Sequence, residues 1–592
     1  MSKQAEQTDK QQIGERPSRR QFIGSTGSVI VGSVVGGTLG SASTTSHAAE
    51  LDLRGTGGRP GDPDQALRNK TFRLRTERAI ANHSVAVPRH PDNDDEDRYA
   101  NKIGTDTRGL PHNSRGEVDL AAWALLKQAV TTREVADFEK VQLGGSRKLV
   151  NPLGTLGVNL TGLSSVQFAV PSAPALASAE RAADAVEVYW QSLLRDVPLY
   201  EFRKDTNHPL VRAAAADINR LSGYTGPRDA SGVVTPDLLF RGTARYVNHA
   251  DPTGRSARHA VPPGVAVGPY ISQFLLLDAP FGTSFIPALL STQAPGNDFL
   301  AQTAEWLAVQ DGKAPTRRIT FDPVRRYLAT GRDLAEVARG APGFASAFQL
   351  LSTPTSSDPT RLGGLGTPLN PTNPYLKLKT STGAAGSFAA GYVQGLLPLA
   401  VSRAIRAAYW QKWFVHRTLR PEAYGGLVHQ RLSAGVDYPL HADVLQSDAV
   451  ARNLRKFGTH LISSAYPEGA PLHGSYPGGA SVSAAVQATL LKAFFDENAT
   501  IANPVQPDPA DPTRLIPYSG PALTIGGELN KLATNLGVGR NWAGIHWRSD
   551  AAASLPLGEE VAIALLRDEK LTFKEPFEGF RFTRFDGSTV SL

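Results

Sequence analysis

Sulfur is what this chain lacks most clearly. Its 592 residues include no cysteine, and the single methionine is Met1. Ordinary composition would give roughly 10–15 sulfur-containing residues in a chain of this length. The absence of cysteine excludes disulfides. Two interpretations of the missing methionine stay open: compositional drift in an exported protein, or contact with a strong oxidant, which attacks thiols and thioethers first.

Long hydrophobic runs and dense basic blocks are also absent. The apolar stretch near the N-terminus is short and rich in glycine, and no later segment approaches the ~20 apolar residues of a transmembrane helix. The net charge of +7 is spread over the chain without a cluster of the kind that binds nucleic acid. We therefore expect a mature protein with neither a membrane span nor a nucleic-acid partner.

The N-terminus carries a twin-arginine pattern, Arg16-Pro-Ser-Arg-Arg-Gln-Phe-Ile23, followed by small residues up to a possible cleavage site at Ser46-His-Ala48. This arrangement predicts a twin-arginine signal peptide over residues 1–48, which is removed after export. A disordered basic tail is the alternative. We expect a periplasmic or extracellular protein.

Apolar residues recur three or four apart in several segments, which predicts a predominantly α-helical fold packed as bundles. The expected helices cover residues 118–130, 175–196, 210–222, 299–310, 384–416, 480–498 and 551–566, with a short one near 334–339. Proline and glycine interrupt residues 311–385, and a long loop of this kind is typical of a site mouth or an oligomer contact.

Two cationic side chains occur in the pattern K-x7-R-P, in the segment Lys412-Trp-Phe-Val-His-Arg-Thr-Leu-Arg420-Pro421. On one continuous helix, positions eight apart lie about 80° from each other around the axis. Lys412 and Arg420 would then meet at the helix end before Pro421. A lysine and an arginine at this spacing are usually a solvated face, but the aromatic context favours a pocket.

A second cluster follows the pattern R-x5-H in Arg540-Asn-Trp-Ala-Gly-Ile-His546, and glycines precede it. Glycine allows close backbone approach, and an imidazole can bind a metal centre through one nitrogen. Together with Lys412 and Arg420, this cluster supplies three fixed cations and one histidine. Such a set suits a tetrahedral oxyanion whose charge must be neutralised on several sides.

The wording of these segments resembles the vanadium-dependent haloperoxidases, which share a phosphate-type site with acid phosphatases. The match extends over Gly-Arg540-Asn-Trp-Ala-Gly-Ile-His-Trp-Arg-Ser-Asp550, Leu557-Gly-Glu-Glu560 and the segments 109–119 and 185–197. It is most similar to the algal and cyanobacterial bromoperoxidase branch. The resemblance implies an all-α fold of two four-helix bundles. It also implies vanadate bound by Lys412, Arg420 and Arg540, with His546 as its protein ligand.

The same resemblance implies that hydrogen peroxide oxidises a halide to hypohalous acid, which halogenates a small organic acceptor, with vanadate acting as a Lewis acid. Phosphate could replace vanadate, and a homo-oligomer is expected. The domain organisation we predict is a signal peptide (1–48), an N-terminal arm with loops (49–174), a first helical bundle with long loops (175–380), and a second bundle with the oxyanion site (381–592).

One family motif is broken. Where the family reads H-P-S-Y-P-S-G-H, this chain reads His473-Gly-Ser-Tyr-Pro-Gly478-Gly479-Ala480. By the resemblance, Gly478 replaces a serine that binds vanadate, and Ala480 replaces the acid–base histidine. Gly479 remains and offers a backbone amide. Since no histidine lies between His473 and His546, a shifted register cannot restore the motif.

Three functions remain open. The first is a weakened haloperoxidase, with bromide favoured over chloride and His473 as a distant substitute base or only a supporting residue. The second is an enzyme that uses the same pocket for a redox-neutral rearrangement, or for phosphatase-like chemistry with His546 as nucleophile. The third is a non-catalytic oxyanion-binding protein.

Overall fold

The computed structural model describes residues 62–592 except 252, 341–342, 359–360 and 379–380. Residues 1–69 and 70–592 form separate units, and only the start of helix α1 is described in the first. The predicted signal peptide therefore lies outside the described residues.

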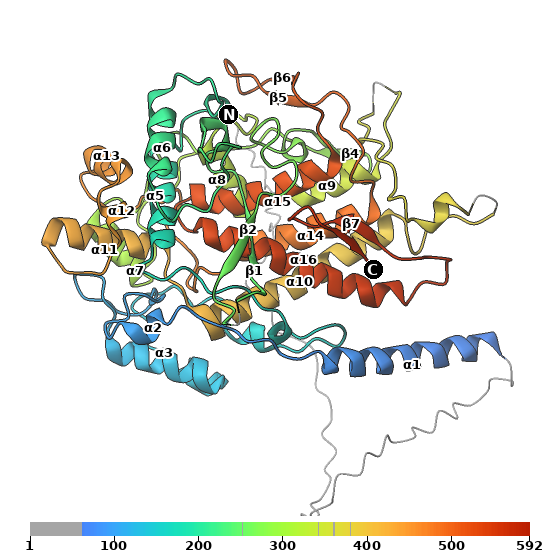
Figure 1. Cartoon of the computed structure of the whole chain (residues 1–592), viewed down its shortest axis with the longest axis horizontal. Coiled ribbons are helices and arrows are strands. Elements are labelled where there is room, and N and C mark those ends of the chain that lie inside the picture. Colours follow the sequence, from blue (N-terminus) through green and yellow to red (C-terminus); the bar gives the residue numbers. More distant parts are fainter. Residues whose placement is uncertain (1–61, 252, 341–342, 359–360, 379–380) are drawn as a thin grey trace, which may run out of the picture. The chain divides into compact units, whose positions relative to one another are not determined.

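Helices dominate the described chain, which confirms the predominantly α-helical fold (Figure 1). The α-helices are α1 (Pro63–Ser84), α2 (Asp95–Arg98), α3 (Leu120–Thr132), α4 (Val135–Phe138), α5 (Ala179–Leu193), α6 (Pro209–Asn219), α7 (Thr303–Gln310), α8 (Gly331–Gly340), α9 (Gly343–Ser352), α10 (Ala390–Gln411), α11 (Pro421–Ala434), α12 (Ala442–Leu445), α13 (Asp448–Phe457), α14 (Gly479–Phe494), α15 (Ile525–Trp542) and α16 (Arg548–Lys570).

The strands form short antiparallel hairpins. They are β1 (Ala244–Val247) with β2 (Ala257–Ala260), β3 (Ala279–Phe281) with β4 (Ser284–Ile286), β5 (Val505–Pro507) with β6 (Leu515–Pro517), and β7 (Arg581–Thr583) with β8 (Thr589–Ser591). Each pair is too small to form a layer of its own, so the helices carry the core.

The core is centred on four helices of the C-terminal half. Helix α14 packs against α10, α15 and α16, and α15 also packs against α8 (Figure 1). Most of the side chains of α14, α15 and α16 are buried, and in α15 and α16 they include charged residues such as Glu528, Lys531 and Glu559 as well as apolar ones. Thr524 caps α15 by accepting a hydrogen bond from the Gly527 amide. These helices form the rigid frame of the candidate site.

The prediction of one helix carrying both Lys412 and Arg420 is wrong. The α-helix ends at Gln411, a wide π-helical turn follows over Lys412–His416, and Arg417 adopts the left-handed conformation with φ 35°. The carbonyl of Arg417 accepts a hydrogen bond of 2.7 Å from Thr105 Oγ1, which fixes the break. Arg420 is instead the N-cap residue of α11, with Pro421 at its first position.

Helix α15 was not predicted, because glycines interrupt its sequence and glycine disfavours helix interiors. The structure shows why glycine is needed there. A Cβ atom on Gly539 would lie 2.6 Å from the Cβ atom of Ala338 and 2.7 Å from the carbonyl oxygen of Leu334. Gly539 therefore lets α15 pack directly on α8, and this packing outweighs the weak helical propensity.

The long loop expected over 311–385 contains α8 and α9, whereas α8 alone was anticipated, near 334–339.

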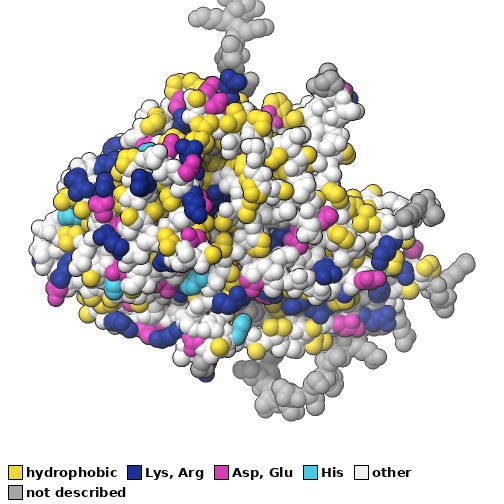
Figure 2. Space-filling view, turned by 45° about the horizontal axis from the view of Figure 1, so that its top comes forward, with side chains coloured by type: hydrophobic (Ala, Val, Ile, Leu, Met, Phe, Trp, Pro, Cys, Tyr) yellow, Lys and Arg dark blue, Asp and Glu magenta, His cyan; other side chains and the backbone are white. Residues whose placement is uncertain are grey.

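On the face shown in Figure 2, lysine and arginine side chains lie among acidic and hydrophobic ones. In the described part of the chain, no helix is both long and apolar enough to cross a bilayer.

Candidate functional site

Lys412 and Arg420 meet at one short loop, residues 473–475. The Lys412 ammonium group donates hydrogen bonds to the carbonyl oxygens of Gly474 (2.9 Å) and Ser475 (2.6 Å). Arg420 donates from Nη2 to the same Gly474 oxygen at 3.4 Å and from Nη1 to the Ile545 carbonyl at 2.7 Å. Both side chains are 0% exposed, and neither forms an ion pair with a described carboxylate.

Arg540 approaches the same place from the last turn of α15. Its guanidinium carbon lies 5.7 Å from the centre of the Tyr466 ring. Among the described residues, no carboxylate pairs with this half-buried guanidinium and no protein group hydrogen-bonds to it. Its charge nevertheless reaches the site: it adds to the burial that lowers the His546 pKa, and it opposes the rise that burial causes in the Tyr409 pKa. Its donors are therefore available to a ligand.

His546 lies directly before α16, and its ring is fixed by Asp550 in the first turn of that helix. His546 Nδ1 donates to Asp550 Oδ2 at 2.7 Å, and the Trp547 amide donates to the same oxygen at 3.0 Å. One carboxylate thus caps α16 and orients the imidazole. With the proton on Nδ1, Nε2 is unprotonated, and its lone pair is available to a metal.

Burial and charge keep this imidazole neutral. The His546 pKa lies well below its ordinary value, because burial disfavours the imidazolium and because Arg420, Lys412 and Arg540 repel a further positive charge. Burial and neighbouring Arg420 likewise lower the Lys412 pKa well below 10.5. Burial and Arg108 lower the Arg420 pKa to about 10. The site is a concentration of positive charge that lacks a counter-ion.

The N-terminus of α14 adds backbone amides to these cations. Gly478 is the N-cap residue, and no side chain caps the helix. Uncapped amides and the helix dipole favour a bound anion. The predicted residues Gly478 and Gly479 thus stand at the start of a long helix, tied to the histidine segment by a 3.2 Å hydrogen bond from the Gly478 amide to the Asp550 carbonyl.

His473 stands beside Arg420. Its Nδ1 lies 3.0 Å from Arg420 Nη2 and 2.8 Å from the Gly474 carbonyl oxygen. Burial, Lys412 and Arg420 hold the His473 pKa well below 6.5. A buried neutral imidazole in this position supports the arginine, and its role as a base stays a prediction.

The sequence reasoning missed three residues around the site. Asp550 orients His546, and the i,i+4 spacing of the pair was the available indication. Arg108 holds the loop before the broken motif through the carbonyls of Pro471 (2.8 Å) and His473 (3.1 Å). Tyr409 faces the site from α10, one turn before Lys412.

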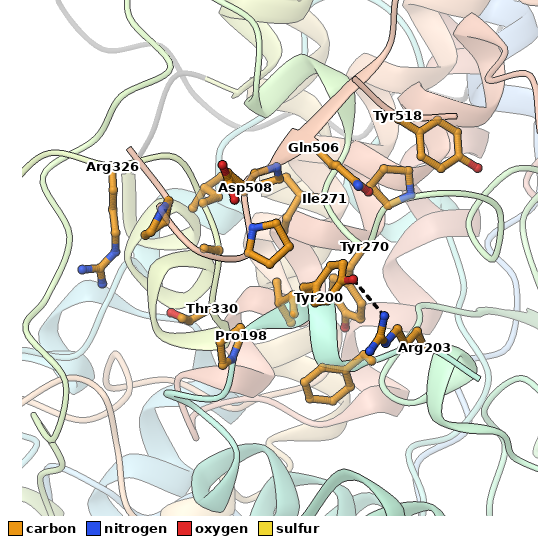
Figure 3. A pocket seen from close by; sticks show the side chains of 18 of the residues that line it. Pro198, Tyr200, Arg203, Tyr270, Ile271, Arg326, Thr330, Gln506, Asp508 and Tyr518 are labelled. Atoms are coloured by element: carbon orange, nitrogen blue, oxygen red, sulfur yellow. Dashed lines mark hydrogen bonds between the residues drawn. The ribbon is translucent and has the colours of Figure 1, made fainter. Parts of the chain in front are cut away.

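A separate cavity of about 540 Å³ lies away from this cluster (Figure 3). It is lined mainly by aromatic residues and prolines, and Arg203 donates a 2.8 Å hydrogen bond to the Tyr200 hydroxyl at its wall. None of the predicted site residues lines it. Its size therefore gives no reason to move the candidate site there.

The chain is also similar in sequence to known proteins. A vanadium-dependent bromoperoxidase of Ascophyllum nodosum is 31% identical over 507 residues, which cover 82% of this chain and 86% of the relative. The chain belongs to the vanadium haloperoxidase family. A vanadium-dependent bromoperoxidase of Corallina pilulifera, 28% identical, covers 87% of this chain and 94% of its own length.

Structure and domain comparisons extend this family assignment. The homohexameric second vanadate-dependent bromoperoxidase of Ascophyllum nodosum superposes with a TM-score of 0.77 at 25% identity, covering 94% of each chain. The domain family described as the VCPO second helical-bundle domain matches residues 455–574. This matched range includes the broken motif, Arg540 and His546.

Proposed function

We propose that the chain binds vanadate at Lys412, Arg420, Arg540 and His546 and uses hydrogen peroxide to oxidise bromide to hypobromous acid. The observation that carries the proposal is the set of three cations with no carboxylate partner, gathered around a neutral histidine whose Nδ1 is held by Asp550. The same donor set accepts phosphate, which we propose as a substitute ligand.

The donor set fits a metal oxyanion better than a bare cation. Lys412, Arg420, Arg540 and the α14 amides would offer positive charge and N–H donors to the oxygens of a bound oxyanion. The unprotonated Nε2 of His546 offers one lone pair to the metal itself. Three cations would repel a free metal cation, whereas they neutralise a tetrahedral anion.

Bound vanadate supplies Lewis-acid activation of hydrogen peroxide. The protein's part is electrostatic and positional. Asp550 keeps the His546 proton on Nδ1, so that Nε2 remains a ligand during the reaction. Lys412, Arg420 and Arg540 stay fixed by burial or helix packing, so they stabilise negative charge without first reorganising.

We propose that this activity is weak, since two donors of the family motif are missing. Gly478 lacks the hydroxyl that would hydrogen-bond the oxyanion, which costs about 1.5–3 kcal/mol of binding free energy. Ala480 lacks an imidazole, and a positioned acid–base group is typically worth about 10²–10⁴ in rate.

The test begins with vanadium analysis of purified protein with and without added vanadate, followed by bromination of monochlorodimedone. We expect one vanadium per chain and slow, peroxide-dependent bromination. Chloride should be a poorer substrate. Stoichiometric vanadium without any halogenation would contradict the peroxidase function.

Restoring the motif sharpens this test. The structure has room for both changes: Ala480 is half-exposed, and a Cβ on Gly478 would lie 3.0 Å from Ser481 Oγ, which can rotate away. The double variant Gly478→Ser, Ala480→His should raise bromide oxidation about 10²–10⁴-fold. Gly478→Ser alone should tighten vanadate binding more than it raises rate.

The missing histidine also favours a second candidate, a redox-neutral rearrangement or phosphatase-like reaction in the same pocket. If this second candidate is correct, the restored variant should show no gain in bromination despite full vanadium loading. Hydrolysis of a phosphate ester that His546→Ala abolishes would support the phosphatase form. A chain that binds oxyanions but catalyses neither reaction would be a binding protein only.

We further propose export by the twin-arginine route and assembly as a homo-oligomer. The Arg19-Arg20 pair supports the first, and the homohexameric relative supports the second. Export of a reporter fused to residues 1–48 should stop when both arginines become lysine. Light scattering of the mature protein should give a mass of several chains.

A further inference from the structure

The broken motif leaves the site with few neutral hydrogen-bond donors, and one aromatic residue lies where such a donor is needed. Tyr409 is in the last turns of α10, three residues before Lys412. Residues three apart on a helix share a face, so Tyr409 points to the side from which Lys412 approaches the 473–475 loop.

Contacts place the Tyr409 ring at the mouth of the cluster. Its centre lies 4.8 Å from that of the His473 ring. A Cβ atom on Gly479 would lie 3.1 Å from Tyr409 Cε2 and 3.8 Å from its hydroxyl oxygen. The hydroxyl therefore lies beside the first residue of α14, where Gly478 and Ala480 flank an uncapped helix end.

The hydroxyl is also available. Tyr409 is half-buried, its hydroxyl forms no hydrogen bond with any residue that the structure describes, and it is not sealed from solvent. Tyr476 and Tyr270, by contrast, are bonded within the protein: each donates to a carbonyl at 2.7 Å, Tyr476 to that of Pro171 and Tyr270 to that of Phe240. The Tyr409 hydroxyl is free to donate to a ligand.

The charges around Tyr409 are those of the oxyanion site. Burial raises its pKa above 10, and Arg420 and Arg540 oppose that rise. The phenol is therefore protonated at neutral pH and lies close enough to both arginines to feel their charge. A neutral O–H in a field of cations can donate to the same anion that the cations attract.

We propose that the Tyr409 hydroxyl donates a hydrogen bond to the oxyanion held by Lys412, Arg420 and Arg540. This bond would take the place of the one that a hydroxyl at Gly478 would make, and it comes from a side chain that lies beside the neighbouring Gly479. The inference rests on the proposed oxyanion site and adds to it a residue that touches the ligand.

The test is isothermal titration of inorganic phosphate and of vanadate into wild-type protein and into Tyr409→Phe. Loss of one hydrogen bond to a charged group should weaken both ligands about 10- to 150-fold. Tyr392→Phe is the matched control: Tyr392 lies on the same helix, but its hydroxyl bonds to Glu569. We expect the control to bind both anions as tightly as wild type.

A second readout separates ligand contact from loss of structure. The phosphorus NMR signal of bound phosphate should shift in Tyr409→Phe and stay in place in Tyr392→Phe, while both variants keep the wild-type circular dichroism. Equal affinity and an unshifted signal in Tyr409→Phe would overturn this inference and leave the site intact. If wild type itself binds neither anion, the oxyanion site fails, and the Tyr409 contact fails with it.

Discussion

Two groups of buried or half-buried cationic side chains in this molecule differ in whether carboxylates pair with them. Arg195 and Arg332 share Asp298, and Arg332 Nη2 also donates to Asp196 Oδ2 at 2.8 Å. We call this set the paired cluster. Lys412, Arg420 and Arg540, the unpaired cluster, bond to carbonyls, to His473 or to no described protein group.

The difference identifies which cluster is structural and which is built for a ligand. Burying a charge is costly unless an opposite charge or strong hydrogen bonds compensate for it. The paired cluster carries its compensation within the protein. Among the described residues the unpaired cluster lacks it, since Asp550, whose charge acts on Lys412 and Arg420, is engaged by His546 and the Trp547 amide. We propose that a bound anion completes it.

The largest expected effect, on the free energy of unfolding, comes from a substitution that breaks the paired cluster. Arg332→Met should leave Asp196 and Asp298 short of a partner in a buried setting and lower the free energy of unfolding by about 3–5 kcal/mol. Denaturant unfolding measures this change. A loss below about 1 kcal/mol would mean that the carboxylates do not compensate this arginine as described.

Arg540→Met is the same substitution in the unpaired cluster, with the opposite expectation. Apart from its 5.7 Å contact with the Tyr466 ring, Arg540 has no described protein partner to lose, so the unfolding free energy without ligand should stay within about 0.5 kcal/mol of wild type. Phosphate binding should weaken by about 1.5–3 kcal/mol. Thermal unfolding with and without phosphate checks both, and undiminished stabilisation by phosphate would contradict the assignment.

Asp550→Asn tests the orientation of the ligand histidine. The amide oxygen can still accept from the Trp547 amide and cap α16, but the charge that holds the His546 proton on Nδ1 is gone. Vanadate affinity should fall about 10–100-fold, which is typical when the hydrogen-bond partner of a metal-binding histidine is mutated. Asp217→Asn is the control, because Asp217 is a buried carboxylate that bonds to Trp190 and Ser447.

The smallest effect is on pH dependence. Burial and Arg420 depress the Lys412 pKa, so an arriving anion should raise it, and binding should take up a fraction of a proton. Affinity should therefore fall as pH rises through the Lys412 pKa of the free protein. Titrations with sulfate in buffers of different ionisation enthalpy measure the uptake, which Lys412→Met should abolish.

Apolar periodicity in the sequence predicted most of the core helices. The motifs in the sequence predicted that Lys412, Arg420 and His546 lie close together. The prediction of one helix for Lys412 and Arg420 was wrong, because the spacing of apolar residues does not reveal a π-helical turn followed by a left-handed Arg417. Glycine-rich α15 escaped prediction because tertiary packing, rather than local propensity, stabilises it.

The parts of the site that the sequence did not reveal depend on contacts between distant segments. Tyr409 looks like one more aromatic residue on a buried helix until its unbonded hydroxyl is seen beside Gly479. Asp550 looks like an ordinary helix N-terminal acid until the His546 ring is seen on its carboxylate. Neither position has a local pattern that distinguishes ligand chemistry from packing.

The most direct measurement is a crystal structure of the mature protein grown with orthovanadate. The unpaired cluster predicts a single vanadium bonded to His546 Nε2, with Lys412, Arg420 and Arg540 donating to its oxygens and the paired cluster unchanged. Vanadate bound elsewhere at full occupancy, with Lys412 and Arg420 still bonded only to the carbonyls of Gly474, Ser475 and Ile545, would contradict this account.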